Sequence, residues 1–355
     1  MHIASFVLGH VLPGVLCIVY SLCFAILATT QPLKPSFMNR PLSLSLCWLL
    51  SCVAPPIPLP NAPEPAAQAP LPRAVQLPED PLITAPIPIL PKPTLTAKEI
   101  RAVKTSEFKA LTFESKQTDL KMPYRLFTPK GYEPSQPYAL ILYLHGAGDR
   151  GTDNKKQFSQ LTMWMARTKH QIETPAFILA PQCPPKPLWV DTPWKSGSYS
   201  VEQTPLSDPM KVALEILDAV QAEYNIDPDR ILVTGVSMGG FGVWDLVTRY
   251  PERFAAVMPV CGAGDPSKAK HISQVPAWIF HGEKDRVVPT RGAREIVKAL
   301  QEAGATPRYV EYKDQAHGVW NDAYKDEQAM AWFFSQARGA TPPMAPPRKA
   351  TTKQQ

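Results

Sequence analysis

The chain has 355 residues, of which 41 are proline, and its formal net charge is +6. Part of the positive excess lies at the very end of the chain, in Arg348, Lys349 and Lys353, and no dense run of Lys and Arg occurs elsewhere. We therefore expect no nucleic-acid partner, because nucleic-acid binding needs a concentrated basic surface.

The first 52 residues predict a protein exported to the bacterial cell envelope. A short positive region around Arg40 precedes a largely apolar run, residues 41–51, which is followed by Cys52. This order of segments is typical of a signal peptide, and its end, Leu-Leu-Ser-Cys, resembles the bacterial lipobox, in which the cysteine is lipidated. On this interpretation translation starts at Met38, and several acyl chains on Cys52 anchor the protein stably to a membrane. Val53 is not Asp, which by the same resemblance favours the outer membrane.

An ordinary signal peptide or membrane anchor is the alternative interpretation of the N-terminus. Residues 3–28 contain no Asp, Glu, Lys or Arg and are long enough to span a bilayer as a helix. In that case Cys52 is incidental, and a cleaved signal leaves a secreted protein. The sequence leaves open whether Met1 or Met38 is the start.

Two proline-rich segments flank the part of the chain that we expect to fold. Fourteen prolines fall between Pro55 and Pro93, and neither this region nor the end of the chain shows a hydrophobic period. We predict an extended linker over residues 53–95 and a disordered basic tail over residues 339–355. The remaining residues, 96–338, are enough for one domain with a full core.

Strand and helix signals alternate along this domain. Continuous apolar runs at 139–144 and 176–180 predict strands that are buried on both faces of a sheet. The expected strands are 108–113, 124–128, 139–144, 176–180, 231–234, 255–260, 277–280 and 309–312, and the expected helices are 208–224, 238–250, 292–303 and 323–337. This alternation predicts an α/β fold with a mostly parallel central sheet and helices on both faces. About a dozen residues separate Cys261 from Val275, which is too few for a large lid domain.

Two cysteines, Cys183 and Cys261, fall inside the expected domain. An exported protein could join them in a disulfide. Each follows a predicted strand, but the proposed fold places two other strands between them. A bridge therefore requires the two loops to bend toward each other, and the sequence leaves their redox state open.

Glycines flank a serine where a predicted strand passes directly into a predicted helix. Gly235, Ser237 and Gly239 form a G-x-S-x-G pattern between the strand at 231–234 and the helix at 238–250. Such a turn strains the serine backbone and has no room for bulky neighbours, and it lifts the hydroxyl clear of the sheet. We interpret Ser237 as a nucleophile, and the alternative is a glycine-rich turn with an incidental serine.

A serine nucleophile needs a base, and two later strand ends provide candidates for the base and for the acid that orients it. Asp285 comes shortly after the strand at 277–280, and His317 comes shortly after the strand at 309–312. Because the carboxyl ends of parallel strands meet at one edge of a sheet, we expect both side chains to reach Ser237. His317 is then the base, and Asp285 orients it.

Other residues remain open for these roles. His281 could be the base and Glu283 or Asp265 the acid, although we expect His281 to be a structural residue that bonds the backbone. His170 and His271 lie in surface-like contexts. The chain contains no H-E-x-x-H motif, no pair of C-x-x-C motifs and no paired His spacing, so we expect neither a metal site nor a cofactor.

A glycine-rich loop, residues 144–151 (LHGAGDRG), follows the strand at 139–144. Its backbone can direct an N–H group at the oxygen that becomes negative during acyl transfer. We expect Ala147, or next to it Gly146, to supply one donor of this oxyanion hole, and Met238, the residue after the nucleophile, to supply the other. The alternative is a tight turn without a catalytic role.

These motifs together resemble the α/β-hydrolase superfamily. Within it, the chain is most similar to a bacterial esterase group that is often labelled predicted peptidase or phospholipase/carboxylesterase and is related to the feruloyl and acetylxylan esterases. The motifs are LHGAGDRG (144–151), APQCP (180–184), DPDRILVTGVSMGGFGVWDL (227–246), PVCGAGD (259–265), FHGEKDRVVP (280–289) and AHGVW (316–320). The resemblance spans residues 113–336 and implies an α/β-hydrolase fold and a serine carboxylesterase with the triad Ser237, Asp285 and His317.

Aromatic residues predict the substrate-binding wall. Trp189, Trp194 and Tyr199 lie in the long segment 184–205, and Trp320 lies three residues after the expected base. Aromatic side chains beside an open site suit stacking on a sugar or an aryl group, although ordinary packing is the alternative. We therefore expect short-acyl or aryl esters, on small molecules or on a polysaccharide.

Two other classes of function remain open. A peptidase of the prolyl-oligopeptidase-like type would use the same triad, but the chain has no room for the propeller domain of those enzymes. A non-enzymatic surface binding module would not need an intact triad.

Overall fold

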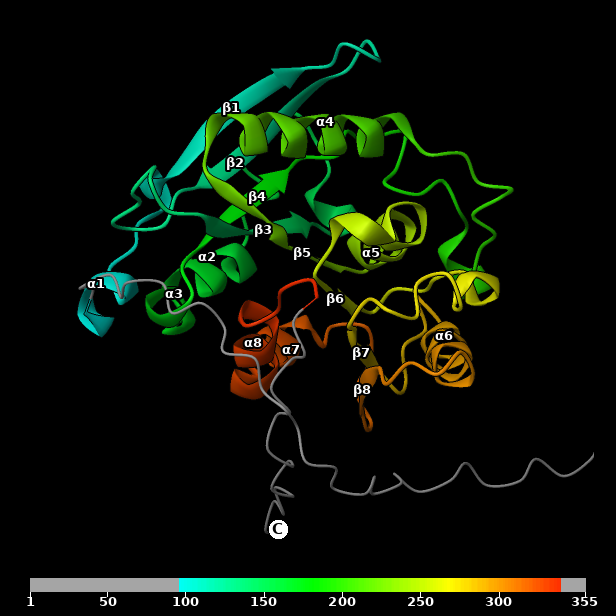
Figure 1. The fold of residues 1–355 in the computed structure, drawn as a ribbon. Helices are drawn as coiled ribbons and strands as arrows, with labels where there is room; N and C mark the ends of the chain where they lie inside the picture. Colours follow the sequence, from blue (N-terminus) through cyan, green and yellow to red (C-terminus); the bar gives the residue numbers. More distant parts are fainter. Residues whose placement is uncertain (1–95, 340–355) are drawn as a thin grey trace, which may run out of the picture. The chain divides into compact units, whose positions relative to one another are not determined.

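Eight strands form one sheet in the computed structural model, which describes residues 96–339 (Figure 1). The strands are β1 (Phe108–Glu114), β2 (Lys121–Phe127), β3 (Tyr138–Leu144), β4 (Ala176–Pro181), β5 (Ile226–Val236), β6 (Ala256–Val260), β7 (Trp278–Gly282) and β8 (Arg308–Tyr312). Their order along the sheet is β1-β2-β4-β3-β5-β6-β7-β8. The pairs β1–β2 and β2–β4 are antiparallel, whereas all other neighbours pair in parallel. The predicted mostly parallel sheet is therefore confirmed.

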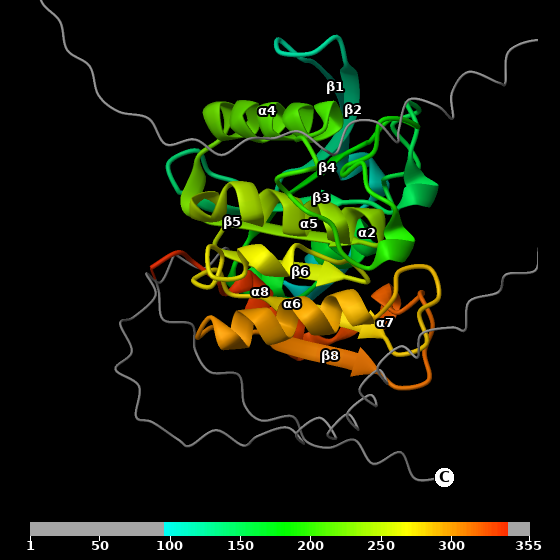
Figure 2. The same cartoon turned by 90° about the vertical axis from the view of Figure 1, so that its right-hand side faces the viewer.

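Helices cover both faces of the sheet, as Figures 1 and 2 show. One face carries α4 (Asp208–Glu223), α5 (Met238–Arg249) and α6 (Arg291–Glu302), and the other carries α1 (Ala97–Arg101), α2 (Gln160–Arg167), α3 (His170–Glu173), α7 (Trp320–Lys325) and α8 (Glu327–Phe334). The buried side chains divide into one cluster for each face. The division arises because successive side chains of a strand point to opposite faces of the sheet. In β3, Leu140 and Leu142 join one cluster while Ile141 and Tyr143 join the other.

The C-terminal helix differs from the prediction of one helix over residues 323–337. The structure has α7 and α8 there, separated at Asp326. The Asp326 side chain accepts the backbone N–H groups of Gln328 and Ala329, so it caps the start of α8. An aspartate in this position begins a new helix more readily than it continues an old one, and the apolar pattern alone did not reveal the break.

Strand β5 is longer than the apolar run that predicted it. It begins at Ile226, five residues before the expected start, and Ile226 pairs with Tyr138 of β3 before a shift of register. The charged residues Asp227, Asp229 and Arg230 hid this part of the strand, because together with Pro228 they interrupt the apolar run. The helices α1, α2 and α3 were not predicted either, since each is short.

No large insertion covers the carboxyl edge of the described sheet between β6 and β7. That connection holds one short 3₁₀ helix, Pro266–Lys268, as the prediction of no large lid domain requires. Cys183 and Cys261 are both buried and carry free thiols, so the disulfide considered from the sequence is not formed. None of the described helices combines the length and the apolar character that crossing a membrane requires.

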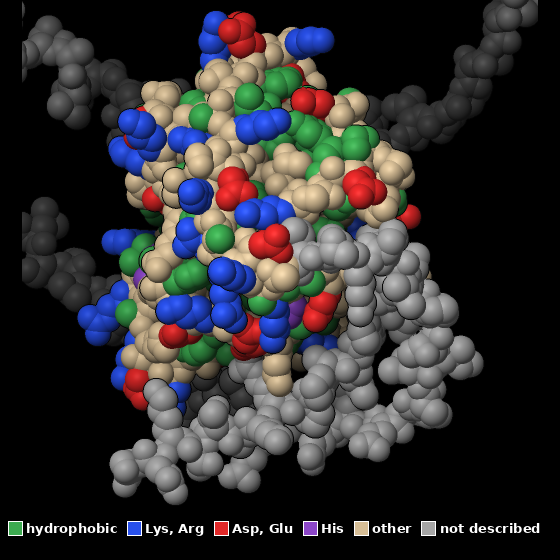
Figure 3. Space-filling view, turned by 90° about the vertical axis from the view of Figure 1, so that its left-hand side faces the viewer, with side chains coloured by type: hydrophobic (Ala, Val, Ile, Leu, Met, Phe, Trp, Pro, Cys, Tyr) green, Lys and Arg blue, Asp and Glu red, His purple; other side chains and the backbone are tan. Residues whose placement is uncertain are grey.

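The predictions for the N-terminus and the tail, including lipidation at Cys52, concern residues 1–95 and 340–355, which lie outside the described residues. On the face drawn in Figure 3, basic and acidic side chains are interspersed. Ion pairs also join neighbouring elements of the domain, and Lys169 next to α3 lies 2.9 Å from a carboxylate oxygen of Glu327 on α8.

Candidate active site

Ser237 occupies a strained backbone conformation between β5 and α5. Its φ is 55° and its ψ is −116°, a region that residues other than glycine avoid. The turn is too tight for side chains on either side: a Cβ at Gly235 would lie 2.6 Å from the carbonyl oxygen of Gly239, and a Cβ at Gly239 would lie 1.9 Å from that of Leu144. The backbone N–H of Ser237 donates to Val260 of β6 at 2.8 Å. This geometry is the one expected of a nucleophile elbow.

Three side chains that are distant in sequence meet at the carboxyl edge of the sheet. The Nε2 atom of His317 lies 2.8 Å from the hydroxyl oxygen of Ser237. Its Nδ1 atom lies 2.6 Å from Oδ2 of Asp285. Because the carboxylate can only accept, Nδ1 carries the hydrogen, and the lone pair of Nε2 then accepts the hydroxyl hydrogen of Ser237. The structure thus brings together the three residues that the sequence singled out for catalysis.

The carboxylate of Asp285 is held in its charged form. Burial by itself raises the pKa of Asp285, but hydrogen bonds from His281, from His317 and from the backbone of Val288 outweigh burial and hold the pKa well below its ordinary value. Oδ1 also accepts the backbone N–H of Val287 at 2.8 Å. A carboxylate with so many donors stays charged, as the acid that orients a catalytic base must be.

The glycine-rich loop lies directly beside Ser237. A Cβ at Gly146 would lie 3.8 Å from the Cβ of Ser237, and Ala147 lines the same cavity as Ser237. Ala147 is the first residue of a short 3₁₀ helix, and Met238 is the first residue of α5. The first N–H groups of a helix have no partner in a preceding turn, so both residues present donors suited to an oxyanion hole. Their catalytic role stays a prediction.

Buried polar contacts hold this loop in place. His145 is completely buried, and burial lowers the pKa of its imidazole to about 4, so the ring is neutral. Its Nδ1 donates to the carbonyl oxygen of Gly146 at 2.7 Å, and its Nε2 accepts the N–H of Cys183 at 2.9 Å. Arg150 donates to the carbonyl oxygens of Ala147 and Pro185, both at 2.8 Å. Sequence reasoning missed these supports, although both residues stand in the LHGAGDRG motif.

A cavity of about 570 Å³ opens over Ser237 and His317. Its apolar lining includes Trp194 and Trp320 together with Val287, which is 44% exposed. The ring of Trp320 stands edge to face against the imidazole of His317, with centroids 5.6 Å apart. Trp194 and Trp320 are therefore placed where substrate contacts were predicted, and Val287 is a third wall residue that the sequence did not indicate.

The prediction for Trp189 is wrong. Its side chain is completely buried, so it does not reach the cavity. The indole N–H donates instead to the carbonyl oxygen of His145 at 3.2 Å. Trp189 belongs to the core cluster under α4 and α5. Through its hydrogen bond to His145 it helps to fix the glycine-rich loop. Position in a long loop did not distinguish this tryptophan from Trp194, which lies five residues later.

The other candidates for base and acid do not contact the serine–histidine pair. Glu283 is exposed, and its carboxylate accepts the N–H of Asp314 at 2.8 Å. Asp265 accepts the N–H of Val201 at 2.9 Å and so ties the wall segment to the loop after β6. His281 is buried beside Asp285, where its Nε2 lies 2.9 Å from the carbonyl oxygen of Val288. It bonds the backbone, as expected.

The two remaining histidines of the described domain, His170 and His271, differ in their burial. His271 is exposed, in keeping with its surface-like context. His170 is buried, contrary to the expectation, because its ring packs against Phe334 of α8 with centroids 5.9 Å apart. The helix that carries His170, α3, lies against α8. Neither His170 nor His271 lines the cavity at Ser237.

One group of residues could in principle hold a metal ion. Ligand atoms of Cys261, His281 and Asp285 all lie within 4.8 Å of one another. The thiol of Cys261 and the carboxylate of Asp285 already have partners, however, since Cys261 donates to the carbonyl oxygen of His317 at 3.2 Å and both oxygens of Asp285 accept hydrogen bonds. Burial also raises the pKa of the Cys261 thiol to about 12, which disfavours the thiolate that a metal requires.

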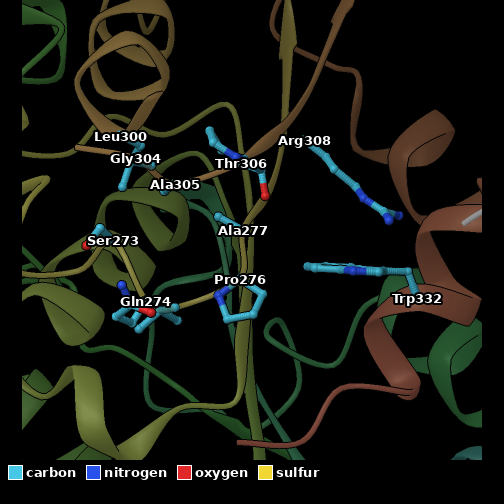
Figure 4. Close-up of a pocket in the computed structure, with 12 residues that line it drawn as sticks. Ser273, Gln274, Pro276, Ala277, Leu300, Gly304, Ala305, Thr306, Arg308 and Trp332 are labelled. Carbon is cyan, nitrogen blue, oxygen red and sulfur yellow. The ribbon is translucent and has the colours of Figure 1, made fainter. Parts of the chain in front are cut away.

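A second cavity, of about 300 Å³, lies at the opposite end of the strands (Figure 4). Ala277 and Arg308 line it just before β7 and at the start of β8, whereas the candidate catalytic residues follow the carboxyl ends of these strands. The guanidinium of Arg308 lies over the ring of Trp332, 5.5 Å from its centroid. This cavity is therefore separate from the site at Ser237.

Comparison with known proteins agrees with this geometry. The family model described as "Putative esterase" matches residues 115–337, which is more than half of the chain. The chain is 29% identical over 183 residues to the probable feruloyl esterase C of Aspergillus terreus, covering 51% of this chain and 62% of that protein. It is 28% identical over 103 residues to the bifunctional acetylxylan esterase/xylanase XynS20E of Neocallimastix patriciarum, covering 29% of this chain and 14% of that protein.

The chain thus spans less than two thirds of the length of these curated relatives. Among solved structures, a thermostable esterase is similar with 39% sequence identity and a TM-score of 0.61, over 66% of this chain and 64% of that one. An acylaminoacyl peptidase of Pyrococcus horikoshii shares the fold at 16% identity and a TM-score of 0.50, over 67% of this chain and 43% of that one. The match of the family model, together with the fold and the thermostable esterase, shows that the chain belongs to the esterase family of α/β-hydrolases.

Proposed function

We propose that the chain is a serine carboxylesterase that works through an acyl-enzyme on Ser237. One observation carries the proposal: two hydrogen bonds connect Asp285 through His317 to Ser237, at 2.6 and 2.8 Å. This arrangement supplies a nucleophile, a base within reach of its hydrogen, and an acid that orients the base.

The reaction follows from these positions. His317 takes the proton of the Ser237 hydroxyl as Oγ attacks the ester carbonyl, and Asp285 stabilises the imidazolium that results. The backbone N–H groups of Met238 and Ala147 donate to the negative oxygen of the tetrahedral intermediate. His317 then gives the proton to the alcohol that leaves. Water repeats the cycle on the acyl-enzyme and releases the acid.

The walls of the cavity support an aryl or short-acyl ester as the substrate. The indoles of Trp194 and Trp320 flank the reacting atoms and suit contact with an aromatic ring or with the apolar face of a sugar. The names of two relatives, a feruloyl esterase and an acetylxylan esterase, agree with esters of this kind on a polysaccharide. A screen of purified protein on acetyl, butyryl and feruloyl esters tests this choice, and equal kcat/KM values for all three would contradict an aromatic preference.

A peptidase is the second candidate, because an acylaminoacyl peptidase shares the fold. The two functions separate on matched substrates. Hydrolysis of p-nitrophenyl acetate without cleavage of peptide p-nitroanilides supports the esterase, and the reverse supports the peptidase. A non-enzymatic binding module predicts neither activity, as well as no labelling of Ser237 by a fluorophosphonate.

The N-terminal sequence supports a location in the cell envelope. We propose that Cys52 is lipidated after cleavage of residues 38–51, with the proline-rich residues 53–95 as a spacer between membrane and enzyme. Growth of the producing bacterium with radioactive palmitate tests this. Label in the wild-type protein and not in Cys52→Ala supports a lipid anchor, and equal absence from both supports an ordinary signal peptide or anchor helix.

A further inference from the structure

A second imidazole lies beside the carboxylate of Asp285, on the side away from the solvent. His281 belongs to β7, four residues before Asp285, and its side chain is completely buried. Its Nε2 atom lies 3.2 Å from Oδ2 of Asp285 and 2.9 Å from the carbonyl oxygen of Val288. Both neighbours are acceptors, so Nε2 must carry the hydrogen and share it between them.

The other ring nitrogen of His281, Nδ1, makes no contact in the described domain that would suggest a second role for this residue. Within the described residues, Nδ1 of His281 is buried and has no hydrogen-bond partner. A hydrogen on Nδ1 would have no acceptor, so the tautomer with hydrogen on Nε2 is the one that fits the surroundings. Because the side chain has no exposed surface, it cannot reach a substrate above Ser237.

Asp285 thereby receives two donors on each oxygen. Oδ1 accepts the backbone N–H groups of Val287 and Val288 at 2.8 and 2.9 Å. Oδ2 faces Nδ1 of His317 at 2.6 Å and Nε2 of His281 at 3.2 Å. With two donors on each side, the plane of the carboxylate cannot rotate without breaking a contact. His281 also holds the loop itself, because its second acceptor is the carbonyl oxygen of Val288.

We propose that His281 is a positioning residue for the esterase reaction, which aligns the carboxylate of Asp285 with His317 through its Nε2–H. This inference rests on the proposed function. His281 touches neither Ser237 nor the substrate and acts only through Asp285. Its loss leaves the nucleophile and the base in place but lets the acid turn, so kcat falls while KM for a small ester changes little.

The test compares three variants on p-nitrophenyl acetate. His281→Leu removes the donor, and we expect kcat to fall about 10- to 100-fold, by analogy with residues that orient a metal-bound histidine, while KM changes less than about threefold. His281→Gln keeps an N–H donor and should restore most of kcat. His170→Leu is the matched control, since it removes a buried histidine that packs against Phe334, and its kcat should stay within about twofold of wild type. Thermal unfolding of each variant sets an assay temperature at which all are folded.

Proton NMR gives a readout that a merely structural role would not move. The low-field resonance of the hydrogen between His317 and Asp285 should shift in His281→Leu and stay in place in His170→Leu. In the wild-type protein, nitrogen shifts of His281 should show hydrogen on Nε2 and none on Nδ1, and this measurement needs no variant to fold.

Three results would overturn the inference: hydrogen on Nδ1 of His281, an unchanged low-field resonance, or wild-type kcat in a folded His281→Leu. Each is distinguishable from failure of the proposed function. If the esterase assignment itself is wrong, either the wild-type protein does not hydrolyse p-nitrophenyl acetate or Ser237→Ala keeps the wild-type activity. If only this inference is wrong, Ser237→Ala is inactive and His281→Leu is not impaired.

Discussion

Nε2 of His317 lies 2.8 Å from the hydroxyl oxygen of Ser237, although 80 residues separate the two in the sequence. The contact exists because each residue follows the carboxyl end of a strand in the same parallel part of the sheet, Ser237 after β5 and His317 after β8. The same edge carries Asp285 after β7. The predictions below follow from this convergence and from the packing that holds it.

Replacement of the acid should impair the chemical step. We expect Asp285→Asn to lower kcat by about 10⁴, as in serine proteases, because an amide does not hold His317 in the tautomer that accepts the serine proton. Glu283→Gln is the matched control, since this neighbouring carboxylate is exposed and bonds the backbone of Asp314. Steady-state kinetics on p-nitrophenyl acetate measure both, and equal effects of the two changes would contradict the assignment of the acid.

Stability at low pH should also depend on Asp285. Its pKa is held far below the value of about 3.9 in an unfolded chain, so the unfolded state binds more protons than the native state below that pH. The stability that this carboxylate contributes is therefore complete above about pH 4 to 5 and is lost as the pH falls, with a slope of at most about 1.4 kcal/mol per pH unit.

The free energy of unfolding in urea, measured between pH 5 and pH 2, checks this. We expect the decline over that range to be smaller in Asp285→Asn than in the wild-type protein. Asp119→Asn, which changes an exposed carboxyl group in the turn between β1 and β2, is the control for a change of net charge. Parallel curves for Asp285→Asn and wild type would show that Asp285 is not stabilised in its charged form.

The tight turn at the nucleophile should not accept a side chain. A Cβ at Gly239 would lie 1.9 Å from the backbone oxygen of Leu144, which cannot move without disturbing β3. We expect Gly239→Ala to lower the free energy of unfolding by about 3 kcal/mol, the upper end of the usual cost of overpacking. Gly318→Ala is the control, because a Cβ there has open space around it. Similar urea midpoints for both variants would mean that the turn is looser than described.

Two tryptophans of the same loop should behave differently. We expect Trp194→Ala, in the cavity wall, to raise KM for feruloyl esters several-fold more than for acetyl esters, and to cost less stability than Trp189→Ala because Trp194 is only half-buried against the core. Trp189→Ala removes a completely buried indole and should cost about 3–5 kcal/mol of stability. Kinetics on the two esters and urea denaturation separate the cases. Equal destabilisation by both changes would place Trp194 in the core.

The sequence predicted the structure best where a local conformation or environment requires one particular type of residue. Continuous apolar runs marked the buried strands β3 and β4, and glycines on both sides of Ser237 marked a turn in which a Cβ at Gly239 would meet backbone. The expectation that Asp285 and His317 would reach this serine followed from strand ends alone. The structure shows the contacts among the three residues, whereas their roles in catalysis stay predictions.

Properties that depend on distant packing could not be derived in this way. Trp189 and Trp194 both lie in the long segment 184–205, and the packing beneath α4 and α5 decides which of the two is buried. The bond between His281 and Asp285 depends on the return of the loop that follows β7. The break at Asp326 depends on a capping bond, which the apolar spacing of the surrounding residues conceals.

The turnover of Ser237→Ala on p-nitrophenyl acetate tests the central claim most directly. If Ser237 is the nucleophile, kcat should fall by about 10⁶, by analogy with other serine-triad enzymes, while the protein keeps its wild-type thermal unfolding. A folded Ser237→Ala protein that hydrolyses the ester at close to the wild-type rate would contradict the account.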